Sequence, residues 1–132
     1  MNISLKYPIG KIGLPLIVTS SKPNLCFLID TGASHNIVFS YVYQQLPQLF
    51  SSLDNTSLMI GIEGEEKNVE LVETTLSFEE KETTTEFSVM DATRAVIHVQ
   101  QDSGIQIHGI LGIPFLTQNK WILDFNKLTL RC

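Results

Sequence analysis

The sequence has few charged residues and no long apolar run. Charged residues make up 17% of the 132 residues, whereas hydrophobic residues make up 43%. An average soluble domain has about 25% charged residues. A chain of this length and composition can bury a proper core, so disorder is excluded. We expect one globular domain that spans residues 1–132.

The scarcity of cysteine and of basic charge excludes further classes of protein. Cys26 and Cys132 are too few for a disulfide scaffold and lack the spacing of metal ligands. The net charge of -5 argues against nucleic-acid binding, which needs a basic face for the phosphates. The chain does not begin like a signal peptide, and no run approaches the roughly 18 apolar residues of a membrane span. These features predict a soluble, cytoplasmic protein without a nucleic-acid or membrane partner.

Short apolar runs separated by turn residues predict a mainly β chain with one or two short helices. Ser40 can cap a brief helix over 41–46, and Pro114 suits the first turn of a second helix. Residues 94–101 fit either a helical turn or an irregular strand. The predicted strand pairs are 12–18 with 25–29, 58–60 with 69–72, 76–78 with 86–90, and 121–123 with 128–130.

The tripeptide Asp30-Thr31-Gly32 is the main candidate for chemistry. It directly follows an apolar strand, which places a carboxylate at the end of a buried β element. Gly32 allows a tight turn that brings its N–H close to this carboxylate, and Thr31 offers a hydroxyl to a neighbouring backbone. Asp-x-Gly by itself is a common turn, so the surrounding sequence decides its meaning.

Four features in order along the chain together resemble the retropepsin-type aspartic proteases. Residues 28–34 carry the apolar–apolar–Asp-Thr-Gly-Ala-Ser signature, and the hairpin tip from Gly61 to Gly64 stands at the position of the flap. Ile110-Leu111-Gly112 matches the apolar–apolar–Gly element that packs beside the catalytic loop. The ending, residues 113–125, is similar to that of single-domain bacterial members, where a short helix leads into a final hairpin.

The resemblance implies a closed, barrel-like all-β fold with a flap, and an aspartic endopeptidase that needs no metal or organic cofactor. Asp30 would activate water, Thr31 would lock two loops together across a dimer axis, and Gly32 would supply a backbone donor. The flap would close over a protein or peptide substrate. The residues implied in substrate binding are Ala33, Ser34, Gly61, Ile62, Glu63 and Gly64, and those next to the site are Ile110, Leu111 and Gly112.

This chemistry needs two carboxylates around one water, and they share a proton because like charges about 3 Å apart cannot both ionise. The chain has one Asp-Thr-Gly. Asp102-Ser103-Gly104 fits a variant of the signature, but residues 99–101 before it are not a buried apolar strand, so we interpret it as a loop. The second Asp30 is therefore expected from a second copy of the chain in a symmetric homodimer.

Two positions depart from patterns known in the family. Position 33 is Ala, as in retroviral proteases, where pepsin-type enzymes carry Ser; one hydroxyl fewer should raise the apparent pKa of the pair and move activity towards neutral pH. Ile113-Pro114 stands where retroviral enzymes commonly carry Arg, so a dimer salt bridge that depends on this Arg is absent.

Other interpretations stay open. The chain could be a retropepsin-fold binding or dimerisation module without turnover. A hydrolase using Ser34 or His35 would lack a partnered base. Nine of the 14 acidic residues lie between Glu63 and Glu86, against two lysines, so this segment carries -7. It predicts either a solvated face on exposed hairpins or a negative field that favours basic peptides.

Overall fold

The computed structural model describes residues 1–60 and 64–132, so the predictions for Gly61, Ile62 and Glu63 lie outside the described residues. The strands and helices are β1 (Asn2–Ser4), α1 (Lys6–Ile12), β2 (Leu16–Val18), β3 (Cys26–Ile29), β4 (Ile37–Phe39), α2 (Ser40–Gln45), the 3-10 helix η1 (Pro47–Leu49), β5 (Ser51–Ile60), β6 (Glu66–Phe78), β7 (Lys81–Met90), α3 (Thr93–Ser103), β8 (Gly109–Leu111), α4 (Ile113–Asn119), β9 (Ile122–Asp124) and β10 (Thr129–Arg131).

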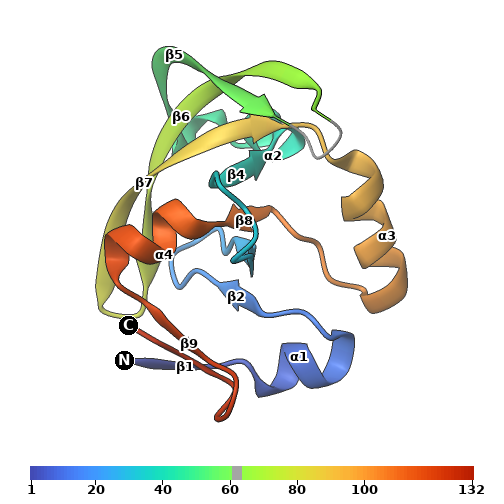
Figure 1. Ribbon diagram of the computed structural model, residues 1–132, viewed down its shortest axis with the longest axis vertical. Helices are drawn as coiled ribbons and strands as arrows, with labels where there is room; N and C mark the ends of the chain where they lie inside the picture. Colours follow the sequence, from blue (N-terminus) through green and yellow to red (C-terminus); the bar gives the residue numbers. More distant parts are fainter. Residues whose placement is uncertain (61–63) are drawn as a thin grey trace.

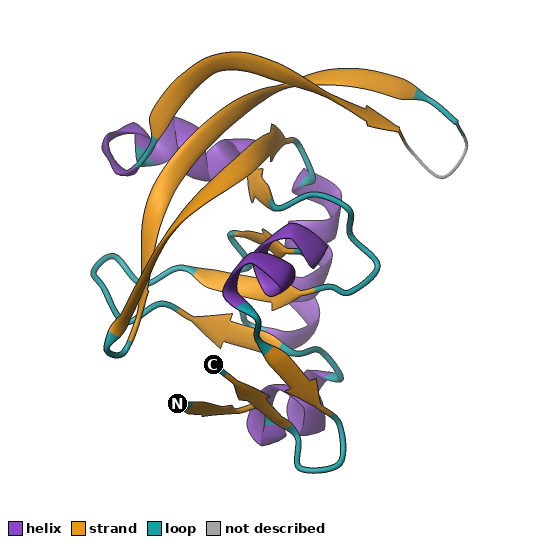
Figure 2. Cartoon of the chain, turned by 60° about the vertical axis from the view of Figure 1, so that its left-hand side comes forward, coloured by secondary structure: helices purple, strands orange, loops and turns teal. Residues whose placement is uncertain are grey.

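In the described part of the chain the strands form two sheets, one of seven strands in the order β2-β3-β8-β4-β7-β6-β5 and one of three strands in the order β1-β10-β9 (Figure 1). The mainly β prediction is confirmed, but the expected closed barrel is wrong. Closure would require β2 to pair with β5, and within residues 1–60 and 64–132 these two strands are the edges of an open sheet. Strands β5, β6 and β7 instead form a long curved arch over the rest of the chain (Figure 2).

The four predicted strand pairs form as the antiparallel neighbours β2–β3, β5–β6, β6–β7 and β9–β10, but some predicted ranges were wrong. Ile12 belongs to α1, and residues 76–78 pair with 81–83 rather than with 86–90. The prediction of one or two short helices is too low, because residues 1–60 and 64–132 contain four α-helices and a 3-10 helix. Helix α1 tolerates Pro8 in its first turn and ends at Gly13, whose φ of 74° is left-handed. Helix α3 covers the ambiguous residues 94–101 and includes Asp102, so interpreting Asp102 as part of a loop was wrong.

Strand β8 lies inside the larger sheet, between β3 and β4. It runs parallel to β3, with Phe27 opposite Gly109 and Ile29 opposite Leu111, and antiparallel to β4. Gly109 has no space for a side chain, because a Cβ there would meet the carbonyl of Ile37 and the ring of Phe27. Because β3 and β8 are parallel and their last residues, Ile29 and Leu111, lie opposite each other, the residues that follow them lie side by side at one end of the sheet.

His108 precedes β8 and ties it to β3. Its Nδ1 accepts a hydrogen bond from the Cys26 N–H at 2.8 Å, and its backbone N–H donates to the Cys26 carbonyl at 2.8 Å. The Nδ1 acceptor requires a neutral ring. Burial lowers the pKa of His108 below its ordinary value of 6.5.

This burial predicts a pH-dependent loss of stability. Between its folded and ordinary pKa values, His108 takes up more protons in the unfolded chain, so its contribution is present above pH 6.5 and is lost as the pH falls below it. From about pH 7.5 to about pH 5, the free energy of unfolding should fall less in His108→Gln than in the wild type. The matched control is His98→Gln, at an exposed position. Equal slopes in all three proteins, measured by urea unfolding, would contradict this role.

Candidate active site

The Asp30 carboxylate is held at the end of β3 by backbone groups. The Asp30 N–H donates to the Leu111 carbonyl at 3.0 Å, which ties the start of the loop to the end of β8. The Gly32 N–H donates to Asp30 Oδ1 at 2.9 Å, and the Ala33 N–H donates to the Asp30 carbonyl at 3.2 Å. The turn thus fixes one carboxylate oxygen through the main chain.

Gly112 is the residue that presses against this turn. A Cβ at Gly112 would lie 2.6 Å from the Ala33 carbonyl oxygen, 2.6 Å from the His35 carbonyl oxygen and 3.1 Å from the Ala33 Cβ. The Ile113 N–H also donates to the Ala33 carbonyl at 2.9 Å. Residues 110–112 therefore lie directly beside the Asp30 loop, and only glycine fits at the contact.

Asn36 is a central residue of the site region that the sequence reasoning missed. Its buried side chain accepts hydrogen bonds at Oδ1 from the N–H groups of Gly112, at 3.0 Å, and Phe115, at 3.2 Å. Its Nδ2 donates to the Glu86 carbonyl at 3.2 Å, and its own carbonyl accepts from the Ser88 N–H. One residue thus joins the loop, the start of α4 and β7; the signal in the sequence was a polar residue directly before the apolar run of residues 37–39.

The Asp-Thr-Gly turn lies at the surface of the single chain. Asp30 is half-buried, whereas Thr31 and Gly32 are exposed. Within the part of the chain that the structure describes, the Thr31 hydroxyl has no hydrogen-bond partner. The end of β8 and Gly112 support the backbone of the loop, whereas Thr31 and Gly32 form its exposed side.

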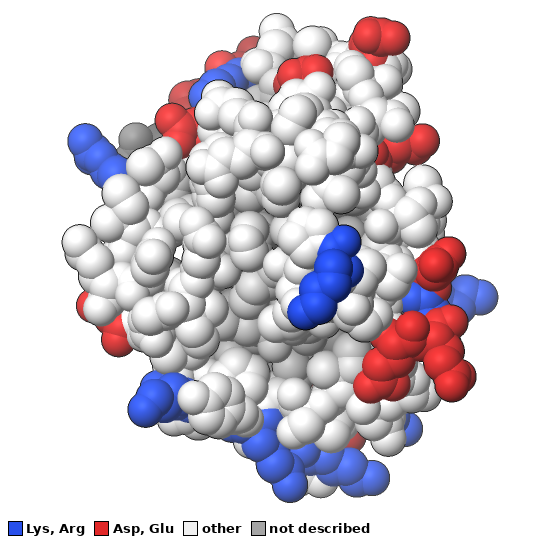
Figure 3. Space-filling view, turned by 180° about the vertical axis from the view of Figure 1, so that it is seen from behind, with Lys and Arg blue, Asp and Glu red and all other residues white. Residues whose placement is uncertain are grey.

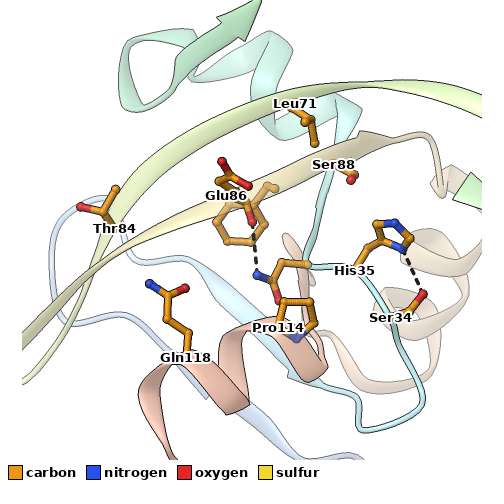
Figure 4. Close-up of a pocket in the computed structure, with 10 residues that line it drawn as sticks. Ser34, His35, Leu71, Thr84, Glu86, Ser88, Pro114 and Gln118 are labelled. Atoms are coloured by element: carbon orange, nitrogen blue, oxygen red, sulfur yellow. Dashed lines mark hydrogen bonds between the residues drawn. The ribbon is translucent and has the colours of Figure 1, made fainter. Parts of the chain in front are cut away.

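Further along the loop, Ser34 and His35 border a pocket of about 400 Å³ between the loop, β6, β7 and α4. Leu71, Glu86 and Gln118 line its other sides (Figure 4).

Ser34 Oγ and His35 Nδ1 are 3.0 Å apart, so His35 is a base within reach of Ser34. Within the described residues, however, His35 Nε2 has no hydrogen-bond partner. Nothing therefore orients the ring as a general base.

The residues predicted to form the flap tip, 61–64, lie between β5 and β6, which pair as antiparallel neighbours. The two strands are in register from Thr56 opposite Glu70 to Ile60 opposite Glu66, after an irregularity between Ser52 and Thr56. Gly64, next to the tip, has a φ of 85°, in the left-handed region that favours glycine.

Asp102 and Cys26, the remaining acid and thiol candidates, lie in surroundings that suit a structural role. Asp102 is on α3 rather than after a strand, and its Oδ2 is 3.3 Å from His98 Nε2 with both side chains exposed. Cys26 is buried, and burial raises the pKa of its thiol to about 11, so it carries little thiolate near neutral pH. Within residues 1–60 and 64–132, no three His, Cys, Asp or Glu side chains gather to bind a metal ion.

Charge is unevenly spread over the surface. Seen from behind, acidic side chains lie mainly along the upper and right-hand margins of the molecule, whereas lysine and arginine gather at its lower end (Figure 3). Lys6 and Lys11 of α1, with Lys127 and Arg131 near the C-terminus, belong to the end that carries the three-stranded sheet. No helix in the described chain has the length and apolar character needed to cross a membrane.

Comparison with solved structures shows a retropepsin-like fold. The chain is similar to EIAV protease, solved in complex with the inhibitor HBY-793, with a TM-score of 0.57 and 21% identity over 85% of this chain and 93% of that one. It is also similar to the retroviral protease-like domain of Ddi1 from Leishmania major, with a TM-score of 0.56 and 12% identity over 92% of this chain and 93% of that one. The sequence matches no protein-family model and no curated protein.

The contact at Gly112 predicts a large cost for adding one methyl group. In Gly112→Ala the new Cβ must displace two backbone carbonyls, so the free energy of unfolding should fall by roughly 2 kcal/mol or more. Gly10→Ala is the matched control, because a Cβ at Gly10 within α1 meets nothing within 4 Å. It should stabilise the chain by about 0.5–1 kcal/mol. Similar urea midpoints for the two variants would show that the loop is not clamped there.

Proposed function

We propose that this chain is an aspartic endopeptidase of the retropepsin type, similar to the single-domain bacterial members, that acts as a homodimer. The observation that carries the proposal is the turn at Asp30. A carboxylate is held by the Gly32 N–H and by β8 at the end of a buried strand, in a retropepsin-like fold. The exposed side of the turn is where a second carboxylate would be needed.

The proposed reaction uses one Asp30 from each copy around a single water. The pair holds one proton, so the ionised member takes a proton from water while the water oxygen bonds to the substrate carbonyl carbon. The protonated member gives its proton to the carbonyl oxygen, which yields a neutral tetrahedral diol. Transfer of a proton to the amide nitrogen and rupture of the C–N bond then release an amine and a carboxylic acid. The pair titrates as a unit.

The neighbouring residues have supporting roles in this proposal. The exposed Thr31 hydroxyl would bond to the loop of the partner copy, and the Gly32 N–H keeps its own carboxylate in place. Ala33 and Ser34 would contact the peptide backbone, and the hairpin of β5 and β6, with Gly64 beside its tip, would cover it. Because Ala33 offers no hydroxyl to the carboxylates, we expect activity closer to neutral pH than in enzymes with Ser at this place. No metal or organic cofactor takes part.

The first prediction of this proposal concerns Asp30→Asn. Asn keeps the shape of the side chain and can still accept from the Gly32 N–H, but it cannot cycle a shared proton. The variant should stay folded, while cleavage of a proteome-derived peptide library falls by at least about 100-fold. Asp102→Asn, on the exposed face of α3, is the matched control and should retain activity. Cleavage by Asp30→Asn at a near wild-type rate would end the aspartic mechanism.

The same assay separates the enzyme from a non-catalytic binding module. A module of the same fold would gain thermal stability from an aspartic-protease inhibitor or a peptide but cleave nothing. Absence of turnover in the wild type over a broad pH range, together with such stabilisation, would favour the module.

A second prediction concerns Gly64→Val. Valine strains the left-handed backbone at φ 85°, and the strain falls on the hairpin that would cover the substrate. Gly13→Val is the matched control, since Gly13 has a φ of 74°, ends α1, and a Cβ added there would meet nothing within 4 Å. Both variants should lose similar stability, of about 1–2 kcal/mol, but only Gly64→Val should lose most of its turnover. Equal losses of activity in both would remove the hairpin from the mechanism.

A further inference from the structure

The pocket of about 400 Å³ beside the Asp30 loop, here called the Glu86 pocket, has an acidic wall and no basic wall. It is bordered by the loop at Ser34, by β6 at Leu71, by β7 at Glu86 and by α4 at Gln118. Among the described residues that line it there is no lysine or arginine. Figure 4 shows Glu86 on β7 across the pocket from Gln118 on α4. A cation that enters this pocket therefore meets the Glu86 carboxylate without competition from a lysine or arginine of the lining.

The negative charge of Glu86 is reinforced by Glu73 on the neighbouring strand. The two residues are register partners in the antiparallel pair of β6 and β7, so their side chains share a face of the sheet with Cβ atoms about 5 Å apart. Glu73 borders an adjoining hollow that shares Thr84 with the Glu86 pocket. Like charges directly opposite each other destabilise a sheet, and within residues 1–60 and 64–132 neither carboxylate forms an ion pair. A bound cation would relieve this repulsion.

The hydroxyl of Ser88 is a second, independent observation that points to a ligand. Ser88 is only 2% exposed and lines the Glu86 pocket from β7, and Figure 4 shows its side chain on the side of β7 that faces the loop. Its backbone N–H donates to the Asn36 carbonyl at 2.9 Å, but within the described residues its hydroxyl has no hydrogen-bond partner. A buried hydroxyl without a partner costs free energy. Ser88 therefore offers the pocket an acceptor that a ligand can use.

The remaining lining suits the side chain of arginine or lysine. Leu71 and Pro114 offer apolar surface to an aliphatic stem, and Gln118 offers an amide oxygen to its charged head. A guanidinium group can donate two parallel hydrogen bonds to a carboxylate and has further N–H groups for a hydroxyl and an amide oxygen. Within the described residues no three His, Cys, Asp or Glu side chains gather, so the pocket suits an organic cation rather than a metal ion.

The Glu86 pocket also lies on the loop that carries Asp30. Ser34 and His35, which border it, directly follow Ala33 in that loop. Gly112 packs against the carbonyl groups of Ala33 and His35, so the carboxylate and the pocket share one backbone support. An extended peptide advances about 3.3 Å per residue. A peptide bound at Asp30 would therefore place in this pocket a side chain that lies outside the cleaved bond.

We propose that the Glu86 pocket binds an arginine or lysine side chain of the substrate, so that this chain selects peptides with a basic residue near the cleaved bond. The Glu86 carboxylate accepts hydrogen bonds from the cationic head, Ser88 and Gln118 accept further ones, and Glu73 adds to the negative field. This inference rests on the proposed function, which supplies the peptide. It assigns to the acidic segment a role in selecting substrates, beyond that of a solvated face.

The test begins with the cleavage-site profile of the full-length wild type on the proteome-derived peptide library, which should show arginine or lysine enriched at one fixed position. Two synthetic peptides then differ only at that position, one with arginine and the other with citrulline, its uncharged isostere. The ratio of their kcat/KM values is measured for the wild type, Glu86→Gln and Glu86→Lys. Glu82→Gln is the matched control, because Glu82 is exposed on the same strand but does not line the Glu86 pocket. Comparing both peptides within one variant cancels any loss of folded enzyme.

The wild type and Glu82→Gln should prefer the arginine peptide by at least about tenfold, Glu86→Gln should prefer it by less than about threefold, and Glu86→Lys should prefer citrulline. A wild type without preference for a basic residue at any position would overturn the proposed pocket but leave an aspartic protease standing. The same holds for a ratio that both Glu86 variants leave unchanged. A wild type that cleaves no peptide would overturn the proposed function and this inference together.

Discussion

The close approach of Gly112 to the carbonyl groups of Ala33 and His35 is the contact on which the rest of the site depends. It exists because β8 runs parallel to β3 and both strands end at the same level. The contact leaves no space for a side chain at position 112, so the backbone carbonyls of the loop pack directly against this glycine. Asn36 stabilises the same junction, because its Oδ1 accepts hydrogen bonds from the N–H groups of Gly112 and Phe115.

The same junction connects the loop to the C-terminal hairpin of β9 and β10. α4 begins at Gly112, and at its far end the Trp121 ring packs edge-on against Phe115 and Phe78, which sets the position of β9. A displacement at Gly112 would therefore change both the carboxylate and this hairpin. The proposed site and the C-terminal hairpin are in this sense one structural unit.

The parts of the structure that were predictable from the sequence depend on local pattern. The four hairpins follow from apolar runs and turn residues that are close in sequence, and the position of Asp30 after β3 follows from the apolar run before it. Helix α3 was ambiguous because its helical character depends on packing rather than on a clear start signal. The pairing of β1 with β10 and the hydrogen bonds of Asn36 join residues far apart in sequence, so no local sequence pattern indicates them. The closed barrel was an expectation taken from the resemblance. It was wrong because β2 and β5, which would have to pair to close the sheet, are its two edges.

The most direct measurement of the central claim, that one active site is built from two chains, is peptidase activity as a function of enzyme concentration. Below the dimer dissociation constant, the rate should fall with the square of the concentration. After subunit exchange, an excess of Asp30→Asn chains should inhibit the wild type, because nearly every wild-type chain is then paired with a variant chain that lacks the second carboxylate. A rate that stays linear down to concentrations where sedimentation shows only monomer, without inhibition by the variant, would contradict the account.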